Sequence, residues 1–288
     1  GTPGDQDNRA VLPQFDQFGT ECLEFVPKAS PAESDYSNVA GSIDWYDLTF
    51  VNGFGLDAFV LDLILQAGGA PMIVSASESI PPIEFGADSH AGGEPGEAAD
   101  GQAHDAAEAG HDHGADPHVW LDPQNVSLWT TTIETALAAR DPARAAGYRR
   151  RAEAYRADLQ SLDAAIERQL AVIPDAARQL VTDHDEFGYF ARRYRFTIVG
   201  AVIPAVSSMA EPSAHDVARL EQSIRELGVR AVFVSTVVNP RLAQRVAGDT
   251  GIRLVNLHTH SLTVGGPADT YLDLMRFNAA AIAAALTP

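Results

Sequence analysis

Apolar residues in the second half of the chain fall into short runs that alternate with segments of helical spacing. The short runs are typical of buried strands, and apolar positions three and four residues apart are typical of amphipathic helices. Such alternation favours a parallel sheet with helices on both faces. The predicted strands are Gln179–Thr182, Thr197–Val202, Ala231–Ser235 and Arg253–Leu257, and the predicted helices are Glu186–Tyr194, Ala214–Leu227, Pro240–Thr250 and Asp269–Leu286.

The first half has a weaker pattern of the same kind. A strand at Asp47–Val51, the Gly-rich turn "NGFG", a helix at Leu56–Gln66 and a strand at Met72–Ala76 are predicted. Residues 1–39 contain apolar positions without a sustained period, so they predict only a strand and a short helix.

A long helical pattern separates the two halves. Its apolar positions recur from Pro142 to Val172, which predicts a helix about 45 Å long. A helix of this length near the midpoint could connect two lobes of an α/β protein, each a parallel sheet covered by helices, an architecture that the family resemblance given below also implies. The predicted bounds are 1–140 for the N-terminal lobe, 141–173 for the connecting helix and 174–288 for the C-terminal lobe.

A low-complexity segment interrupts the N-terminal lobe. Residues 86–117 consist mainly of Gly, Ala, Asp, Glu and His, and offer little to bury, so a mobile loop is expected. "HDH" among acids is a weak, exchangeable site for a borderline metal such as zinc. The alternative is a solvated polar loop with no metal role. The candidate metal-collecting residues are His90, His104, His111 and His113.

Composition excludes several classes of protein. The net charge of −19 argues against nucleic acid as a partner, because phosphate backbones are repelled. The single cysteine, Cys22, excludes an internal disulfide and a thiolate-rich zinc site. No apolar run is long enough to span a bilayer. No basic-then-apolar leader is present, so the chain either never had a signal peptide or is a mature form.

Four further histidines lie where regular structure begins or ends. His118 precedes "VWL", His184 follows an apolar strand, and His258 and His260 follow another. Ligands of open α/β sheets lie beyond the carboxyl ends of strands, which makes these residues candidate metal ligands. Asp185 is a candidate acceptor for the second ring nitrogen of a ligand. Taken alone, His118 is better interpreted as an ordinary partly buried histidine, and His215 is interpreted as a surface residue.

Five segments together carry a family resemblance: "DPHVWLDP", "DHDEFGYFARRY", "AEPSAHDVARL", "VNPRLAQRVAGDTG" and "PADTYLDLMRFN". From about Asp47 onward the chain resembles the metal-binding solute-binding proteins of bacterial ABC importers (the cluster A-I family), above all the zinc-binding branch with its His-rich loop. The resemblance implies two lobes joined by a long helix, with Zn²⁺ held in the cleft between them as the transported ion. It also implies a periplasmic monomer that serves an inner-membrane permease, with a periplasmic zinc chaperone as a further candidate partner.

The resemblance also implies a ligand set. His118 matches the second histidine ligand of the family and His184 the third, while His260 stands where an aspartate is usual. The first histidine has no counterpart in "PKASPAESDYS", so Glu33, Asp35, His258 or water is expected to complete the shell. A shell without a carboxylate should bind zinc more weakly than the family norm.

Four hypotheses remain open on the sequence. The first is a high-affinity zinc-capture protein that is not an enzyme, because imidazole ligands in threes favour zinc over manganese. The alternatives are a manganese-binding homologue, a variant with an impaired metal site, and a zinc hydrolase. A hydrolase would need a general base, and Glu186 is the nearest carboxylate in sequence that has no other expected role.

Overall fold

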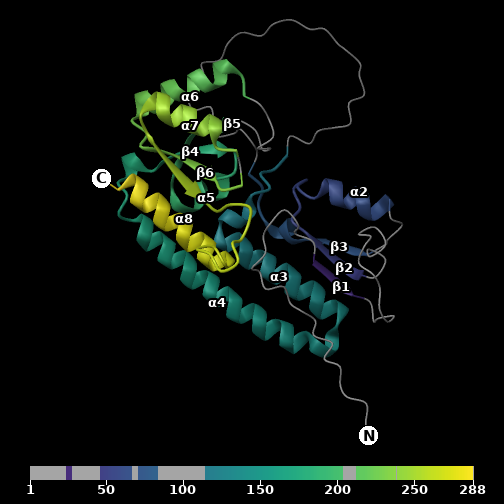
Figure 1. Cartoon of the computed structure of the whole chain (residues 1–288). Helices are drawn as coiled ribbons and strands as arrows, with labels where there is room; N and C mark the ends of the chain where they lie inside the picture. Colours follow the sequence, from purple (N-terminus) through teal and green to yellow (C-terminus); the bar gives the residue numbers. More distant parts are fainter. Residues whose placement is uncertain are drawn as a thin grey trace, which may run out of the picture.

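The computed structural model describes residues 24–27, 46–66, 71–83, 114–203, 212–237 and 239–287, with backbone alone for 24–27 and 46–47. They form two lobes along a pair of long helices (Figure 1). Among these residues, every helix is too short or too polar to cross a membrane. Predictions that concern Cys22, Glu33, Asp35 and the four loop histidines lie outside the described residues.

The N-terminal lobe contains a three-stranded sheet in the order β1-β2-β3. Strands β2 (Tyr46–Val51) and β3 (Met72–Ser75) are parallel and are connected through helix α2 (Ala58–Gln66). Strand β1 (Glu24–Pro27) pairs with β2 in the antiparallel direction, so the parallel sheet expected here has an antiparallel edge. The helix begins two residues later than predicted because the "NGFG" turn has three consecutive residues with positive φ, Gly53, Phe54 and Gly55.

The C-terminal lobe contains a parallel sheet of four strands in the order β5-β4-β6-β7. Every predicted strand and helix of this lobe is present, with bounds that differ by a few residues at most. The strands are β4 (Gln179–His184), β5 (Thr197–Ile203), β6 (Ala231–Ser235) and β7 (Arg253–Leu257), and the helices are α5 (Gly188–Tyr194), α6 (Ala214–Leu227), α7 (Arg241–Thr250) and α8 (Tyr271–Leu286).

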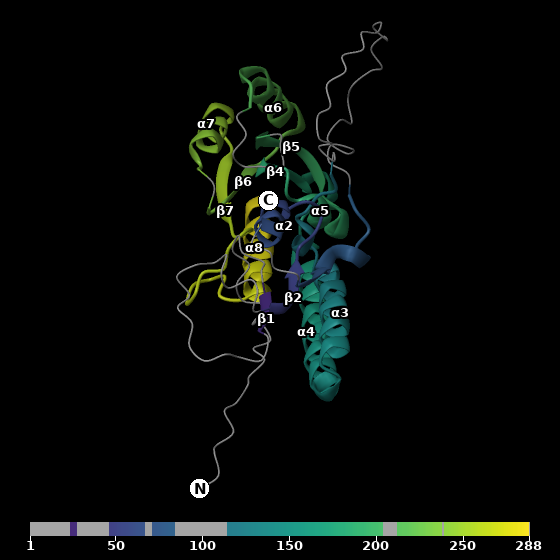
Figure 2. The ribbon, with the colours of Figure 1, turned by 90° about the vertical axis from the view of Figure 1, so that its right-hand side faces the viewer.

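Alternating strand residues face the two helical layers of this sheet. Val181 and Val232 pack with α6 and α7, whereas Leu180 and Phe233 pack with α5, α8 and the long helix α4 (Ala145–Leu170). The two central strands, β4 and β6, are therefore buried on both faces, which explains the continuous apolar run of β6. Figure 2 shows α6 and α7 together at one end of the molecule, away from α4 and its neighbour α3 (Pro123–Arg140).

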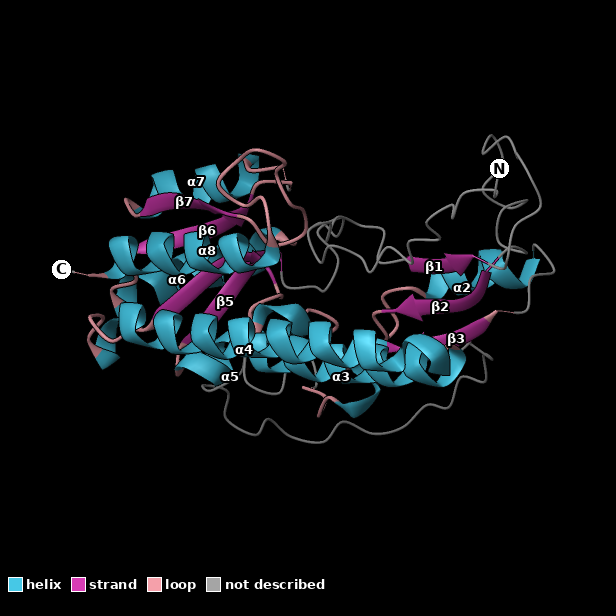
Figure 3. Cartoon of the chain, turned by 90° about the horizontal axis from the view of Figure 1, so that it is seen from below, coloured by secondary structure: helices cyan, strands magenta, loops and turns pink. Residues whose placement is uncertain are grey.

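Two helices, α3 (Pro123–Arg140) and α4 (Ala145–Leu170), run along both lobes (Figure 3). Tyr148 of α4 packs with Leu48 and Phe50 of the N-terminal sheet. Further along the same helix, Leu159, Leu162, Ile166 and Leu170 enter the core of the C-terminal lobe. This packing supports 141–173 as the connecting segment between lobes 1–140 and 174–288, a division that we retain as a proposal.

The start of α3 follows the predicted capping pattern. Asp122 is the N-cap, its side chain accepts a hydrogen bond from the Gln124 backbone nitrogen at 2.8 Å, and Pro123 occupies the first helical turn. Helix α4 is shorter than predicted, because Pro142–Arg144 forms a separate 3₁₀ turn, η4, before it.

The last residues of the low-complexity segment are packed into the fold. Asp116 and Pro117 are buried, the Asp116 backbone nitrogen donates to the Ile83 carbonyl at 2.7 Å, and the Asn52 side-chain amide donates to the Pro117 carbonyl at 3.1 Å. The predicted mobile loop of 86–117 is therefore wrong at its C-terminal end. Composition alone assigned these residues to the loop, although their backbone groups are hydrogen-bonded to the N-terminal lobe.

Candidate metal centre

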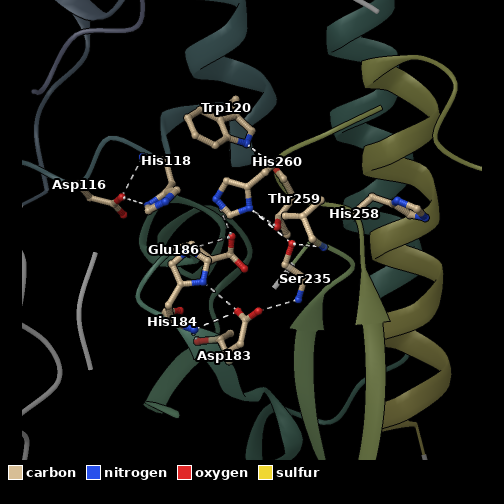
Figure 4. Close-up of polar contacts among 12 residues, drawn as sticks. Asp116, His118, Trp120, Asp183, His184, Glu186, Ser235, His258, Thr259 and His260 are labelled. Carbon is tan, nitrogen blue, oxygen red and sulfur yellow. Dashed lines mark hydrogen bonds and ion pairs between the residues drawn. The ribbon is translucent and has the colours of Figure 1, made fainter. Parts of the chain in front are cut away.

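Four side chains from three separate segments meet in one cluster: His118, His184, Glu186 and His260 (Figure 4). Each offers one potential ligand atom, and these atoms all lie within 4.8 Å of one another. The three histidines are those that the sequence predicted to converge. Glu186 was considered only as the base of a hydrolase, and its place in this cluster was not foreseen.

The fold brings these residues together at one edge of the C-terminal sheet. His184 is the last residue of β4, and Glu186 lies in the turn between β4 and α5. His260 follows β7, whose carboxyl end lies at the same edge because all four strands are parallel. His118 immediately precedes the 3₁₀ turn η3 (Val119–Leu121), which leads into α3.

Carboxylates hold the Nδ1 atoms of two of the histidines. His118 Nδ1 lies 2.8 Å from Asp116 Oδ1, and His184 Nδ1 lies 3.0 Å from Asp183 Oδ1. A carboxylate acceptor places the ring proton on Nδ1, which leaves the Nε2 lone pair free for a metal. Asp183 is itself fixed, because its Oδ2 accepts a hydrogen bond from the Ser235 backbone nitrogen at 2.8 Å.

Asp183 therefore supports His184, and the supporting role expected of Asp185 stays a prediction. Asp185 is half-buried in the turn after β4. Sequence reasoning also missed Asp116, because it was grouped with the low-complexity loop. Its position two residues before His118 was the signal that could have found it, since its Oδ1 accepts from both the backbone nitrogen and the ring of His118.

The third histidine has a different environment. His260 Nδ1 lies 2.9 Å from Thr259 Oγ1 and 3.5 Å from Ser235 Oγ. Its side chain is 20% exposed, whereas that of His184 is 2% exposed and that of Glu186 is 1% exposed. His260 is therefore the ligand candidate nearest to solvent.

Glu186 faces both of its histidine neighbours across a short gap. Its Oε2 lies 3.6 Å from His184 Nε2 and 3.6 Å from His260 Nε2. Among the described residues this buried oxygen has no hydrogen-bond partner. A buried unpaired carboxylate oxygen is costly, so its presence requires an explanation, and a bound cation would supply one.

Burial controls the protonation of the cluster. Burial lowers the pKa of His118, although Asp116 opposes that shift. Burial, together with repulsion from His118 and His184, lowers the pKa of His260 to about 3. Burial raises the pKa of Glu186, and the nearby charge of Asp183 adds to that rise. At neutral pH, His118 and His260 are therefore in the neutral form that binds metals.

Other predicted site residues lie elsewhere. His258 is directed towards α8 (Figure 4), where its ring packs edge-on against Phe277 with 4.9 Å between ring centroids. The structure thus does not bring His258 into the cluster, because the chain turns between residues 258 and 260 and does not continue as a strand. His215 is exposed in the first turn of α6, as expected for a surface residue.

The donor set matches a four-coordinate metal. In a tetrahedral zinc site, ligand atoms about 2.1 Å from the ion lie about 3.4 Å from one another. The two 3.6 Å separations at Glu186 are close to that value, and the four ligand atoms all lie within 4.8 Å of one another, so side-chain movements of about 1 Å would bring them to tetrahedral spacing. Three imidazoles and one carboxylate form a shell of borderline character.

Comparison with known proteins identifies the family to which the chain is similar. The family model described as "ZnuA: Zinc-uptake complex component A periplasmic" matches residues 31–285. The manganese-binding lipoprotein MntA of Halalkalibacterium halodurans is 30% identical over 86% of this chain and 73% of its own. The zinc-binding protein TroA of Treponema pallidum is 30% identical, and the iron-binding protein YfeA of Yersinia pestis is 32% identical.

The TroA alignment covers 70% of this chain, and the YfeA alignment covers 59%. This chain spans 59% of the length of TroA and 54% of that of YfeA in these alignments. The solved structure of the zinc-binding TroA covers 93% of this chain and 90% of its own, with a TM-score of 0.71 at 23% identity, which shows that the two share a fold. The chain belongs to the ZnuA family of metal-binding substrate-binding proteins of ABC transporters, which are transport proteins and not enzymes.

Proposed function

We propose that this protein captures one Zn²⁺ ion with His118, His184, Glu186 and His260 and delivers it to the permease of an ABC importer. The observation that carries the proposal is the convergence of four ligand atoms within 4.8 Å around a buried carboxylate oxygen without a hydrogen-bond partner among the described residues. The bound ion is cargo, so a shell of four protein ligands suits it better than an open coordination position.

Glu186 changes the expected strength of the site. The sequence left the fourth ligand open between water, Glu33, Asp35 and His258, and a shell without a carboxylate was expected to bind zinc more weakly. With Glu186 as the fourth ligand, the shell carries one negative charge towards the cation, as the usual family aspartate would. We therefore expect zinc affinity near the family norm, and we no longer favour an impaired site.

Manganese is the second candidate ion, because the relative with the longest alignment here is a manganese-binding lipoprotein. Manganese prefers oxygen ligands, whereas this cluster offers three nitrogens and one carboxylate. The donor set therefore favours zinc.

Calorimetric titration of the metal-free protein with Zn²⁺, repeated with Mn²⁺ as competitor, tests the proposal. The starting protein should carry alanine at His90, His104, His111 and His113, so that loop binding does not obscure the site. We expect one tight site for Zn²⁺, little displacement by Mn²⁺, and severe loss of binding in His118→Ala and His184→Ala. The exposed His215→Ala is the matched control. Unchanged affinity in both site variants would contradict the proposal.

Location and partners follow from the same proposal. The family model is described as periplasmic, and several relatives are named as metal ABC transporter substrate-binding lipoproteins. We propose a periplasmic monomer whose partners are an inner-membrane permease and a zinc chaperone, with the loop histidines as a first point of metal collection. Crosslinking of the zinc-loaded protein to its permease in membranes tests the partnership.

A further inference from the structure

We infer that Trp120 and Thr259 form a positioning pair that holds His260 in its ligand position. Neither residue is itself a candidate ligand. The inference rests on the proposed function, since it concerns the geometry of the same metal site. It identifies how a ligand on an irregular segment is held in register with ligands on regular elements.

His260 needs external support more than the other ligand candidates. His184 ends a strand and His118 leads into a helix, so hydrogen-bonded backbone fixes both. His260 lies between β7 and α8 in a stretch that forms neither helix nor strand. Metal ligands must be held to within about 0.5 Å, which side chains on loops achieve only with supporting contacts.

Trp120 supplies the backbone support. Its Nε1 donates a hydrogen bond to the Thr259 carbonyl at 2.8 Å, and both residues are buried. The Trp120 carbonyl in turn accepts a hydrogen bond from the Tyr271 hydroxyl at 2.7 Å, at the start of α8. The segment that carries His260 is thereby tied to the segment that carries His118.

The indole ring also packs beside both of the ligands that it connects. Its centroid is 5.4 Å from the ring centroid of His118 and 6.0 Å from that of His260, in both cases with an edge-on arrangement. Figure 4 shows the Trp120 ring next to both imidazoles. Rotation of either imidazole away from the cluster is therefore limited by the indole.

Thr259 supplies the side-chain support. Its hydroxyl lies 2.9 Å from His260 Nδ1. A hydroxyl can accept the Nδ1 proton of His260. In that tautomer the Nε2 lone pair of His260 is free for a metal, and Nε2 lies 3.6 Å from Glu186 Oε2.

The partner of His260 is therefore a neutral hydroxyl, where His118 and His184 have carboxylates. A hydroxyl attracts the imidazole less strongly than a charged acceptor does. The position of His260 then depends on how firmly Thr259 is held, and the Trp120 hydrogen bond to the Thr259 carbonyl holds it. The Trp120–Thr259 hydrogen bond thus positions Thr259, and the Thr259–His260 contact positions His260.

Three variants test the pair. Thr259→Val removes the hydroxyl and keeps the shape, Thr259→Ser keeps the hydroxyl, and Trp120→Phe removes the indole donor. Loss of such supporting contacts typically lowers metal affinity 10–100-fold. We expect a loss of about that size in Thr259→Val and Trp120→Phe, measured by chelator competition, and about wild-type affinity in Thr259→Ser.

Trp129→Phe is the matched control, because Trp129 is also a buried tryptophan and its Nε1 donates to Ser77 Oγ at 2.9 Å, outside the cluster. It should lower stability without lowering metal affinity. The absorption spectrum of bound Co²⁺ reports ligand geometry directly, and it should change in Thr259→Val and return to that of the wild type in Thr259→Ser.

Wild-type affinity and a wild-type Co²⁺ spectrum in Thr259→Val would overturn the inference and leave the capture function intact. Failure of the unmodified protein to bind Zn²⁺, or full binding by His118→Ala, would instead overturn the proposed function. Should Trp120→Phe not fold, the comparison of Thr259→Val with Thr259→Ser still tests whether the Thr259 hydroxyl positions His260.

Discussion

Gly188 occupies a position where one added methyl group would disturb the metal centre without touching a ligand. A Cβ atom at Gly188 would lie 2.7 Å from Asp116 Oδ2, whereas ordinary contacts begin at 3.4 Å. In Gly188→Ala the Asp116 carboxylate must therefore move by about 0.7 Å. The same carboxylate accepts the hydrogen bond from His118 Nδ1 at 2.8 Å, so a shift of that size takes the contact to the limit of a hydrogen bond.

The magnitude follows from the role of that contact. Loss of the acceptor behind a metal-bound histidine lowers affinity about 10–100-fold, equivalent to about 1.4–2.7 kcal/mol. Stability should change less, because alanine is favoured over glycine in a helix by up to about 1 kcal/mol and Gly188 begins α5. We therefore expect a large loss of zinc affinity with a small change in the unfolding free energy.

Zinc calorimetry and thermal unfolding of the metal-free protein measure the two effects separately. Gly248→Ala in α7 is the matched control, since a Cβ there has no heavy atom within 4 Å, and it should raise stability slightly with unchanged affinity. If folded Gly188→Ala binds zinc as tightly as the wild type, then Asp116 does not position His118 for the metal and the reasoning fails.

Four further predictions concern the same centre. Glu186→Gln should weaken zinc binding by at least about 10-fold, because it removes the anionic ligand, and calorimetry checks this. Asp183→Asn should weaken binding more than Asp185→Asn, since Asp183 holds the ring of His184; equal effects would contradict the assignment. Because the pKa of Glu186 is raised, zinc must displace its proton, and zinc affinity should fall as pH decreases through that raised pKa. His260 has a pKa of about 3, so its protonation should lower zinc affinity only in strong acid. Titrations in buffers of different ionisation enthalpy should detect this proton release and its loss in Glu186→Gln. Deleting residues 86–113 should slow zinc loading in stopped-flow experiments yet leave the tight site, and loss of all binding would show that the loop is the site.

The fold was predictable where apolar periodicity alone decides it. Ala231–Ser235 and Arg253–Leu257 were predicted with their observed bounds, because each has a short apolar stretch bounded by polar residues; the first is buried throughout, and the second is an edge strand that is buried only at Leu257. The antiparallel edge strand Glu24–Pro27 was not predictable, since its direction depends on a pairing partner distant in the sequence and not on its own pattern.

The candidate site likewise contains residues that the sequence pattern could identify and residues that it could not. The histidines at 118, 184 and 260 were identifiable because the ends of parallel strands share one edge. Glu186 was missed as a ligand because its direction depends on the turn between β4 and α5, which sequence spacing does not specify. The role of Asp183 was missed for a related reason: its side chain reaches the backbone and the ring of the residue that follows it, a local contact that strand alternation does not predict.

The sharing of α4 between two apolar cores has a consequence for how cargo is exchanged. Tyr148 near one end of this helix and Ile166 near the other are buried in different lobes, so wide separation of the lobes would require bending a continuous helix. A continuous helix therefore limits large rigid-body rotations of one lobe relative to the other. Ion entry and exit are then expected to proceed through small local rearrangements at the partly exposed His260, so the speed of handover would be governed by one loop and not by a hinge.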